Sequence, residues 1–277
     1  RVETFGKAGE GPPCLGAGYS DYDVGLTGLA LLAFLGAGQG PDSIAKADDE
    51  TSFGLVVGRG LAWLVAQQGR DGTFGPSVSK GMYNHAIAVS ALAEAAAMTG
   101  NERFSSSAQK GVDALVAAQN QDLAWRYSPK CRENDTSVTG WCVMALRTAE
   151  LAGLSVPLSA YAGAIRYIRQ VTDAKTGKVG YQGLEDAGVK VVVPGKNENY
   201  QNHETGAAIG LLCRMLLSAE KEDSMVFTEA ALLMGDLPVW DTVNLTNDYY
   251  YWYYGTYALV AVDGPGSGNK GNNWALE

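Results

Sequence analysis

Five runs of small apolar residues recur along the chain, and each begins just after a short polar or acidic cluster. The runs start near Asp23, His85, Asp135, His203 and Asp248. More amphipathic stretches lie between them, so the pattern predicts buried helices that alternate with surface helices. A repeat of this size is typical of an array of helical hairpins. If the five runs are equivalent inner helices, their polar starts gather at one end of the fold.

The pattern predicts an all-α fold. We expect inner helices over 23–35, 84–98, 135–151, 204–218 and 249–262, and outer helices over 53–68, 102–119, 158–171 and 224–234. The Gly- and Asn-rich segment 172–201 interrupts the alternation and predicts a long loop with a β-like stretch at 189–193. The domain organisation is then an irregular segment over 1–20, a helical domain over 21–262 and an irregular tail over 263–277.

Small residues within the inner runs indicate close helix packing. Gly25 and Gly140 lie inside predicted helices, where glycine costs up to about 1 kcal/mol relative to alanine. We expect this cost to be offset by the close approach of a neighbouring helix.

A phrase recurs between the hairpins. Residues 59–75 read RGLAWLVAQQGRDGTFG, residues 110–127 read KGVDALVAAQNQDLAWRY, and a looser copy at 164–182 reads AIRYIRQVTDAKTGKVGYQ. Each copy combines a basic residue, an aromatic or leucine, glutamine and a later aromatic. The phrase resembles the QW repeat of squalene-hopene cyclases and of protein prenyltransferase β subunits, whose aromatics pack between hairpins. This makes Trp63 and Trp125 structural candidates, and we expect Trp141 to be structural as well.

The resemblance covers roughly residues 21–262 and implies an α/α toroid with a central ligand cavity. The wording YNHAIAVSALAEA, NDTSVTGWCVMAL and YYWYYGTYAL is most similar to bacterial prenyltransferase/squalene-oxidase-repeat proteins. Five inner runs are fewer than the six of a closed toroid. We therefore expect a ring that is open, incomplete, or completed by residues outside this chain.

The chain departs from the chemistry of both families. Asn134 stands where the cyclases carry their proton-donating Asp, and an amide cannot supply that proton. Of the acidic residues of the cyclase motif, only the Asp that follows the proton donor has a match here, in Asp135. Tyr254 stands at the position of the prenyltransferase zinc-binding His, with no Cys nearby. We therefore expect neither a metal nor a cofactor.

The remaining candidate chemistry lies at the starts of the inner runs and in the last run. The catalytic candidates are His85, His203, Asp135 and Glu204, because imidazoles and carboxylates at one rim can perform acid–base work. The ligand-binding candidates are Asp23, Asn84, Asn134, Asn202, Asp248, Tyr250, Tyr251 and Tyr254. The alternative for the rim residues is structural, since Asp and Asn at helix starts are ordinary caps. The alternative for the tyrosines is core packing.

The charge and hydropathy of the chain limit the classes of partner that it can bind. The formal net charge is −9, which argues against a nucleic-acid backbone or an anionic membrane surface as the partner. No run reaches the roughly 18 apolar residues of a membrane span. We expect a small-molecule or glycan ligand in the cavity, or a partner protein domain. The sequence does not determine the oligomeric state. It also leaves open whether the protein is periplasmic, secreted or cytoplasmic.

Two functional hypotheses follow. The first is a toroid that binds a ligand in its central cavity without established catalysis, which the lost cyclase acid and zinc ligands favour. The second is a cyclase-like or lyase-like enzyme that acts on an isoprenoid or saccharide through His85, His203 and the rim carboxylates.

Overall fold

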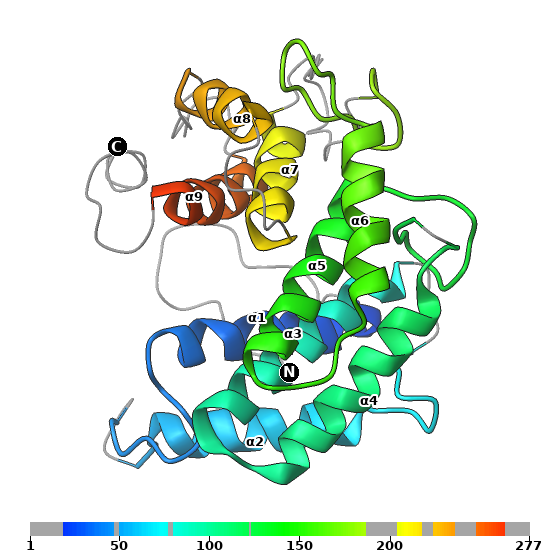
Figure 1. Cartoon of the computed structure of the whole chain (residues 1–277). Helices are drawn as coiled ribbons and strands as arrows, with labels where there is room; N and C mark the ends of the chain where they lie inside the picture. The colour runs from blue at the N-terminus through cyan, green and yellow to red at the C-terminus, as the bar shows by residue number, and fades with distance from the viewer. Residues whose placement is uncertain are drawn as a thin grey trace.

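The computed structural model describes residues 19–46, 50–76, 80–121, 123–186, 204–217, 224–235 and 248–263. Over these ranges the chain forms α-helices, one short 3₁₀ helix (Ser20–Tyr22) and isolated β-bridges without a sheet (Figure 1). The helices are α1 (Asp23–Gly36), α2 (Phe53–Ala66), α3 (Gly81–Thr99), α4 (Glu102–Ala118), α5 (Thr136–Leu151), α6 (Leu158–Gln170), α7 (Glu204–Leu217), α8 (Ser224–Gly235) and α9 (Tyr249–Asp263). The predicted all-α class is confirmed. The β-like stretch predicted at 189–193 lies outside the described residues.

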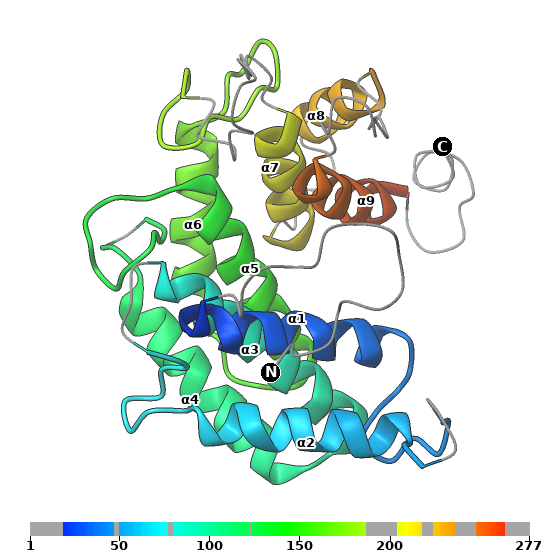
Figure 2. The ribbon, with the colours of Figure 1, turned by 180° about the vertical axis from the view of Figure 1, so that it is seen from behind.

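The odd-numbered helices pack against one another in a row. Helix α1 packs against α3, α3 against α5, α5 against α7, and α7 against α9. The even-numbered helices lie outside this row, as α4 and α6 do beside α3 and α5 (Figures 1 and 2). The burial pattern follows the sequence pattern: α3 is buried nearly all round, whereas α4 and α6 bury one face. The predicted alternation is therefore confirmed for α3 to α6. Helix α1, predicted to be buried, instead exposes Leu26 and Leu29, because it ends the row and packs mainly against α3 and α2.

Two glycines allow the inner helices to approach closely, as predicted. A Cβ atom added to Gly25 of α1 would lie 2.6 Å from Oδ1 of Asn84 in α3. One added to Gly140 of α5 would lie 2.6 Å from Cγ2 of Ile209 in α7. Such distances are well inside van der Waals contact. The helix packing therefore requires glycine at both positions.

Helix α3 begins one turn earlier than the sequence pattern predicts. It starts at Gly81, directly after Lys80, whose φ of 69° places it in the left-handed region. The N–H of Met82 then donates to the main-chain oxygen of Tyr127 at 3.2 Å. This acceptor comes from the segment after α4, so no local pattern announces it. Asn84 and His85 consequently lie within α3 and not at its capping position.

The repeated phrase has a repeated structure. In the first copy, Nε2 of Gln68 donates to the main-chain oxygens of Gly72 at 3.0 Å and Ser107 at 2.9 Å. In the second copy, Nε2 of Gln119 donates to those of Leu123 at 2.8 Å and Ala160 at 3.0 Å. Each glutamine therefore closes its own turn and ties it to the next outer helix.

The aromatic residue six positions after each of these glutamines is buried. Phe74 is 2% exposed and Trp125 is 1% exposed, and the indole N–H of Trp125 donates to the oxygen of Leu115 at 2.8 Å. The predicted packing role of Trp125 is confirmed. Trp63 is different, because it is 38% exposed on the outer surface of α2.

Gln119→Ala tests this role of the phrase. We expect the free energy of unfolding to fall by about 1–3 kcal/mol, because two main-chain carbonyls lose their donor. The matched control is Gln121→Ala, since Gln121 is exposed in the same connecting segment. Denaturant unfolding of both variants measures the difference. Equal stability of the two variants would contradict the role.

Candidate functional site

An open pocket of about 470 Å³ lies where α1, α3, α5 and α9 meet. Most of its lining surface is apolar. The described residues that line it are Tyr22, Gly25, Leu26, Leu29, Lys80, Tyr83, Asn84, Ile87, Ser137, Trp141 and Tyr250. Its volume lies within the range of small-molecule sites, and it is wide open to solvent.

The first turns of the odd-numbered helices are joined by side-chain hydrogen bonds. Asn84 of α3 accepts from the N–H of Gly25 in α1 at 3.1 Å. Ser137 of α5 bonds to Tyr83 of α3 at 2.7 Å and to Tyr250 of α9 at 2.7 Å. A further bond at 2.9 Å runs from the hydroxyl of Thr205 in α7 to Asp248 before α9. These contacts confirm that the amino ends of the inner helices gather together, and the pocket lies among them.

Asn84 lines the pocket while its amide holds α1 in position. Besides accepting from Gly25, it donates through Nδ2 to the main-chain oxygen of Asp21 at 2.7 Å. It is only 2% exposed. The side chain therefore supplies the hydrogen bonding that α1 lacks, because Tyr22 at its N-cap makes no side-chain cap. This is a structural task at the edge of the site.

The aromatic run at the start of α9 divides between the pocket and the core. Tyr250 lines the pocket. Tyr254 is fully buried, with its ring 5.8 Å from that of Trp141 in an edge-on arrangement. Tyr251 lies on another face, where its hydroxyl donates to the oxygen of Leu233 in α8 at 3.4 Å. Of the predicted ligand-binding tyrosines, the structure brings only Tyr250 to the pocket.

A chain of hydroxyl groups crosses the pocket wall. We refer to Tyr83, Ser137 and Tyr250 as the hydroxyl trio. Within it, Ser137 bonds to both tyrosines, and the indole N–H of Trp141 donates to the Tyr250 oxygen at 2.8 Å. Sequence reasoning missed Tyr83 and Ser137 as site residues. The two residues lie 54 positions apart in the chain and are related only through their hydrogen bond.

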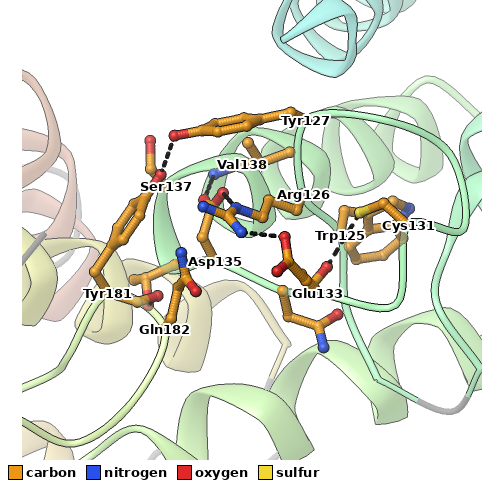
Figure 3. Close-up of polar contacts among 12 residues, drawn as sticks. Trp125, Arg126, Tyr127, Cys131, Glu133, Asp135, Ser137, Val138, Tyr181 and Gln182 are labelled. Carbon is orange, nitrogen blue, oxygen red and sulfur yellow. Dashed lines mark hydrogen bonds and ion pairs between the residues drawn. The ribbon is translucent and has the colours of Figure 1, made fainter. Parts of the chain in front are cut away.

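A second polar cluster adjoins this wall, around Asp135 (Figure 3). Asp135 is fully buried and caps α5, accepting from the N–H of Val138 at 2.7 Å. Its other carboxylate oxygen faces Nε of Arg126 at 3.6 Å, and that guanidinium also pairs with Glu133. Asp135 itself does not line the pocket, although Ser137 two residues later does.

Burial controls the ionisation of Asp135. Loss of hydration raises its pKa to about 6, against the opposing effects of the Val138 N–H, the Tyr181 hydroxyl and the Arg126 guanidinium. The carboxyl therefore changes charge near neutral pH. That property suits an acid, but it also follows from any buried capping carboxyl.

His85 is built into the core. It is 3% exposed, its Nδ1 accepts from the N–H of Phe74 at 3.1 Å, and its Nε2 lies 3.0 Å from the oxygen of Gly111. Because Nδ1 is an acceptor, the proton resides on Nε2, which donates to Gly111. Burial lowers the pKa of His85 to about 4, so the ring is neutral at physiological pH. Both ring nitrogens are thus hydrogen-bonded to main-chain groups, so neither is free to act as the acid or base that the sequence predicted.

The other predicted rim residues have varied positions. Asp23 is exposed as the first residue of α1. Asn134 accepts from Asn120 Nδ2 at 3.0 Å and from the Ala124 N–H at 3.1 Å, which orders the connection between α4 and α5. Asp248 caps α9 by accepting from the N–H groups of Tyr250 and Tyr251.

Three candidates of the fourth inner run stay predictions. Glu204 is the first residue of α7. His203 and Asn202 lie outside the described residues. The shared site of two imidazoles is therefore a prediction that the described residues do not test.

Within the described part of the chain, no three His, Cys, Asp or Glu side chains lie close enough to hold a metal ion. No helix there is long and apolar enough to cross a bilayer. No protein-family model matches the chain, and comparison with curated proteins and with solved structures gives no match either. The functional conclusions consequently depend on the pocket and its surroundings.

Proposed function

We propose that this chain is a ligand-binding domain whose pocket takes a small, largely apolar molecule. The observation that carries the proposal is the open pocket of about 470 Å³ among the first turns of the inner helices. Its aliphatic wall comes from Leu26, Leu29 and Ile87, and aromatic rings face them from α5 and α9. Burying an apolar molecule against such walls is favourable at about 25 cal/mol per Å².

We further propose that the odd-numbered helices are the inner helices of an α/α toroid, similar to that of terpenoid cyclases and prenyltransferase β subunits. The equivalent bonding of Gln68 and Gln119 and the buried aromatics that follow them support this relationship. In such an arrangement the pocket corresponds to the central cavity.

Binding is favoured over catalysis by the composition of the pocket wall. Among the described residues that line it, the titratable side chains are three tyrosines and Lys80, with no carboxylate or imidazole. Two of the candidate acids and bases already serve the structure, since His85 bridges main-chain groups and Asp135 caps α5. Saccharide recognition is less favoured, because sugar rings require many polar partners and most of the accessible surface of this wall is apolar.

An enzymatic role is the second candidate, and Asp135 is the observation that favours it. Its carboxyl has a pKa of about 6 and lies at the start of an inner helix, two residues before Ser137 of the pocket wall. A general acid must reach the reacting atom within hydrogen-bond distance. Reaching the pocket from Asp135 would therefore require a rearrangement of the α5 start on binding.

Isothermal titration calorimetry with farnesol and with maltotriose tests the proposal. We expect farnesol to bind and maltotriose not to bind, because the wall is mostly apolar. Leu26→Arg, which places a charge at the 60%-exposed mouth position, should weaken farnesol binding at least about tenfold, since ligand entry would desolvate the charge. The matched control is Leu158→Arg, at a 77%-exposed leucine on α6 that does not line the pocket.

Each outcome bears on the proposal. Farnesol binding that Leu158→Arg preserves and Leu26→Arg weakens supports it. Absence of farnesol binding, or equal affinity in the two variants, overturns it. Recovery of a chemically altered farnesol after incubation, analysed by mass spectrometry, would favour the enzymatic candidate.

A further inference from the structure

We propose that the hydroxyl trio presents one uncommitted O–H donor to the pocket, so that the preferred ligand is an apolar molecule bearing a hydrogen-bond-accepting oxygen, such as a ketone. This inference rests on the proposed function and deepens it, because it names the chemical group of the ligand that the pocket recognises.

The trio contains more protons than internal hydrogen bonds. Tyr83, Ser137 and Tyr250 each carry one hydroxyl proton. Two hydrogen bonds join them, Tyr83 to Ser137 and Ser137 to Tyr250, both at 2.7 Å. Each bond uses one proton, so one of the three protons has no acceptor within the trio, whichever way the bonds run.

Over the ranges that the structure describes, no hydrogen bond between the trio and a neighbouring acceptor takes up this proton: the hydroxyl of Tyr254, whose ring lies 5.0 Å from that of Tyr250, forms no hydrogen bond. The one further hydrogen bond to the trio comes from Trp141, whose indole N–H donates to the Tyr250 oxygen at 2.8 Å. Indole is a donor only, so it adds a proton to the wall and offers no acceptor. All three hydroxyl residues line the pocket. The uncommitted donor is therefore available to a molecule that enters it.

The surroundings of Tyr250 favour that residue as the donor. Burial raises its pKa to about 12, while hydrogen bonding from Ser137 and Trp141 acts to lower it. Burial also raises the pKa of Tyr83, with only the hydrogen bond from Ser137 acting against it. An oxygen that accepts from Trp141 and Ser137 keeps its own proton free for a ligand, and accepting makes that proton a stronger donor.

The consequence for selectivity follows from desolvation. A hydrocarbon in the pocket would remove water from the uncommitted hydroxyl without replacing its hydrogen bond. A ketone of the same skeleton would replace it, and a buried polar group left unpaired is costly. The pocket should therefore prefer the ketone over the hydrocarbon, after correction for the different hydration of the two free molecules.

The experiment measures the affinities of 1-tetralone and of tetralin by isothermal titration calorimetry. Their ratio is compared between the wild-type chain, Ser137→Ala, and the triple variant Tyr83→Phe/Ser137→Ala/Tyr250→Phe. Comparison among variants cancels the hydration difference of the free probes. Tyr257→Phe is the control, because Tyr257 is 53% exposed on α9 and does not line the pocket.

The two variants should shift the ratio in opposite directions. Ser137→Ala breaks both bonds and leaves two uncommitted tyrosine hydroxyls, so the ketone-to-hydrocarbon ratio should rise by a few-fold. The triple variant removes all three hydroxyls, so the ratio should fall by roughly three- to tenfold, the released Trp141 N–H replacing part of the lost donor. Tyr257→Phe should leave the ratio unchanged.

A change in the same direction in both variants, or no change in either, overturns the inference and leaves the proposed function standing. If neither probe binds the wild-type chain, the proposed function itself fails. Should the triple variant not fold, the carbonyl stretch of 1-tetralone bound to the wild-type chain decides. A shift to lower wavenumber than in an alkane solvent supports the donor, and an alkane-like position overturns it.

Discussion

His85→Ala should lower the free energy of unfolding by roughly 3–5 kcal/mol. The substitution leaves the N–H of Phe74 and the oxygen of Gly111 buried without a partner, and it removes a ring that stacks on Phe74 with centroids 5.8 Å apart. The imidazole joins three segments of the chain: the turn after α2, helix α3 and helix α4. Thermal or denaturant unfolding measures the loss. A change below about 1 kcal/mol would contradict the structural role and restore His85 as a functional candidate.

The same imidazole should make stability depend on pH. Its pKa is about 4 in the folded chain against an ordinary value of 6.5. Because the pKa is lower in the folded chain, the contribution of the neutral imidazole to the free energy of unfolding is fully present above pH 6.5. It is lost as the pH falls toward 4. The difference between these two pKa values corresponds to roughly 3 kcal/mol in the free energy of unfolding.

The variant that isolates this dependence is His85→Gln. The glutamine amide can accept from Phe74 and donate to Gly111 without titrating, so it should be more stable than His85→Ala and should lack the loss between pH 6.5 and 4. Since the chain has only two histidines, NMR of labelled histidine also tests the assignment. We expect one imidazole to remain neutral throughout the range above pH 5. Titration of both imidazoles near pH 6.5 would contradict it.

Asp135 should give the stability of the wild-type chain the opposite pH dependence, and Asp135→Asn should remove it. Burial raises the pKa of Asp135 to about 6, from an ordinary value of 3.8. A raised folded-state pKa means that this contribution is present below pH 3.8 and is lost as pH rises through 6, by roughly 3 kcal/mol. Asparagine keeps an oxygen for the Val138 N–H but carries no charge. The free energy of unfolding of Asp135→Asn, relative to that of the wild-type chain, should therefore increase between pH 4 and pH 7.

Asp135→Ala is the comparison for the cap. It removes the acceptor for Val138 as well as the charge, so it should be less stable than Asp135→Asn by about 1–2 kcal/mol at every pH. Denaturant unfolding at several pH values measures both effects. A difference between Asp135→Asn and the wild-type chain that does not vary with pH would mean that the buried carboxyl keeps an ordinary pKa. In the wild-type chain the effects of His85 and Asp135 oppose each other between pH 4 and 6.5, so only the variants separate them.

The helices and their alternation could be predicted from the sequence because burial imposes a local pattern. A run such as that of α3 is apolar nearly all round and must be an inner helix, whereas α4 and α6 carry a polar face. The repeated phrase likewise indicated equivalent turns, which the bonding of Gln68 and Gln119 bears out. The helix-capping roles of Asp135 and Asp248 could also be predicted from the sequence, because capping depends on the next few residues.

The site was predicted only in part. Tyr250 was among the candidates and lines the pocket, but Tyr251 in the same run turns toward α8. Neighbouring residues on a helix point in different directions, and the packing partners decide which one meets the cavity. Tyr83 and Ser137 were missed because a tyrosine and a serine at helix starts carry no signal individually. They gain importance only through a contact across 54 residues.

The sequence by itself therefore determined the helical class, the order of inner and outer helices, the close approach at glycine and the ends that carry polar groups. Each of these follows from spacing and residue type within a few turns of chain. The tertiary structure decided where α3 begins, that both nitrogens of His85 are occupied by main-chain groups, and which hydroxyls meet in the pocket wall. These depend on hydrogen-bond partners from distant repeats, and a local pattern cannot encode which distant group will be within about 3 Å.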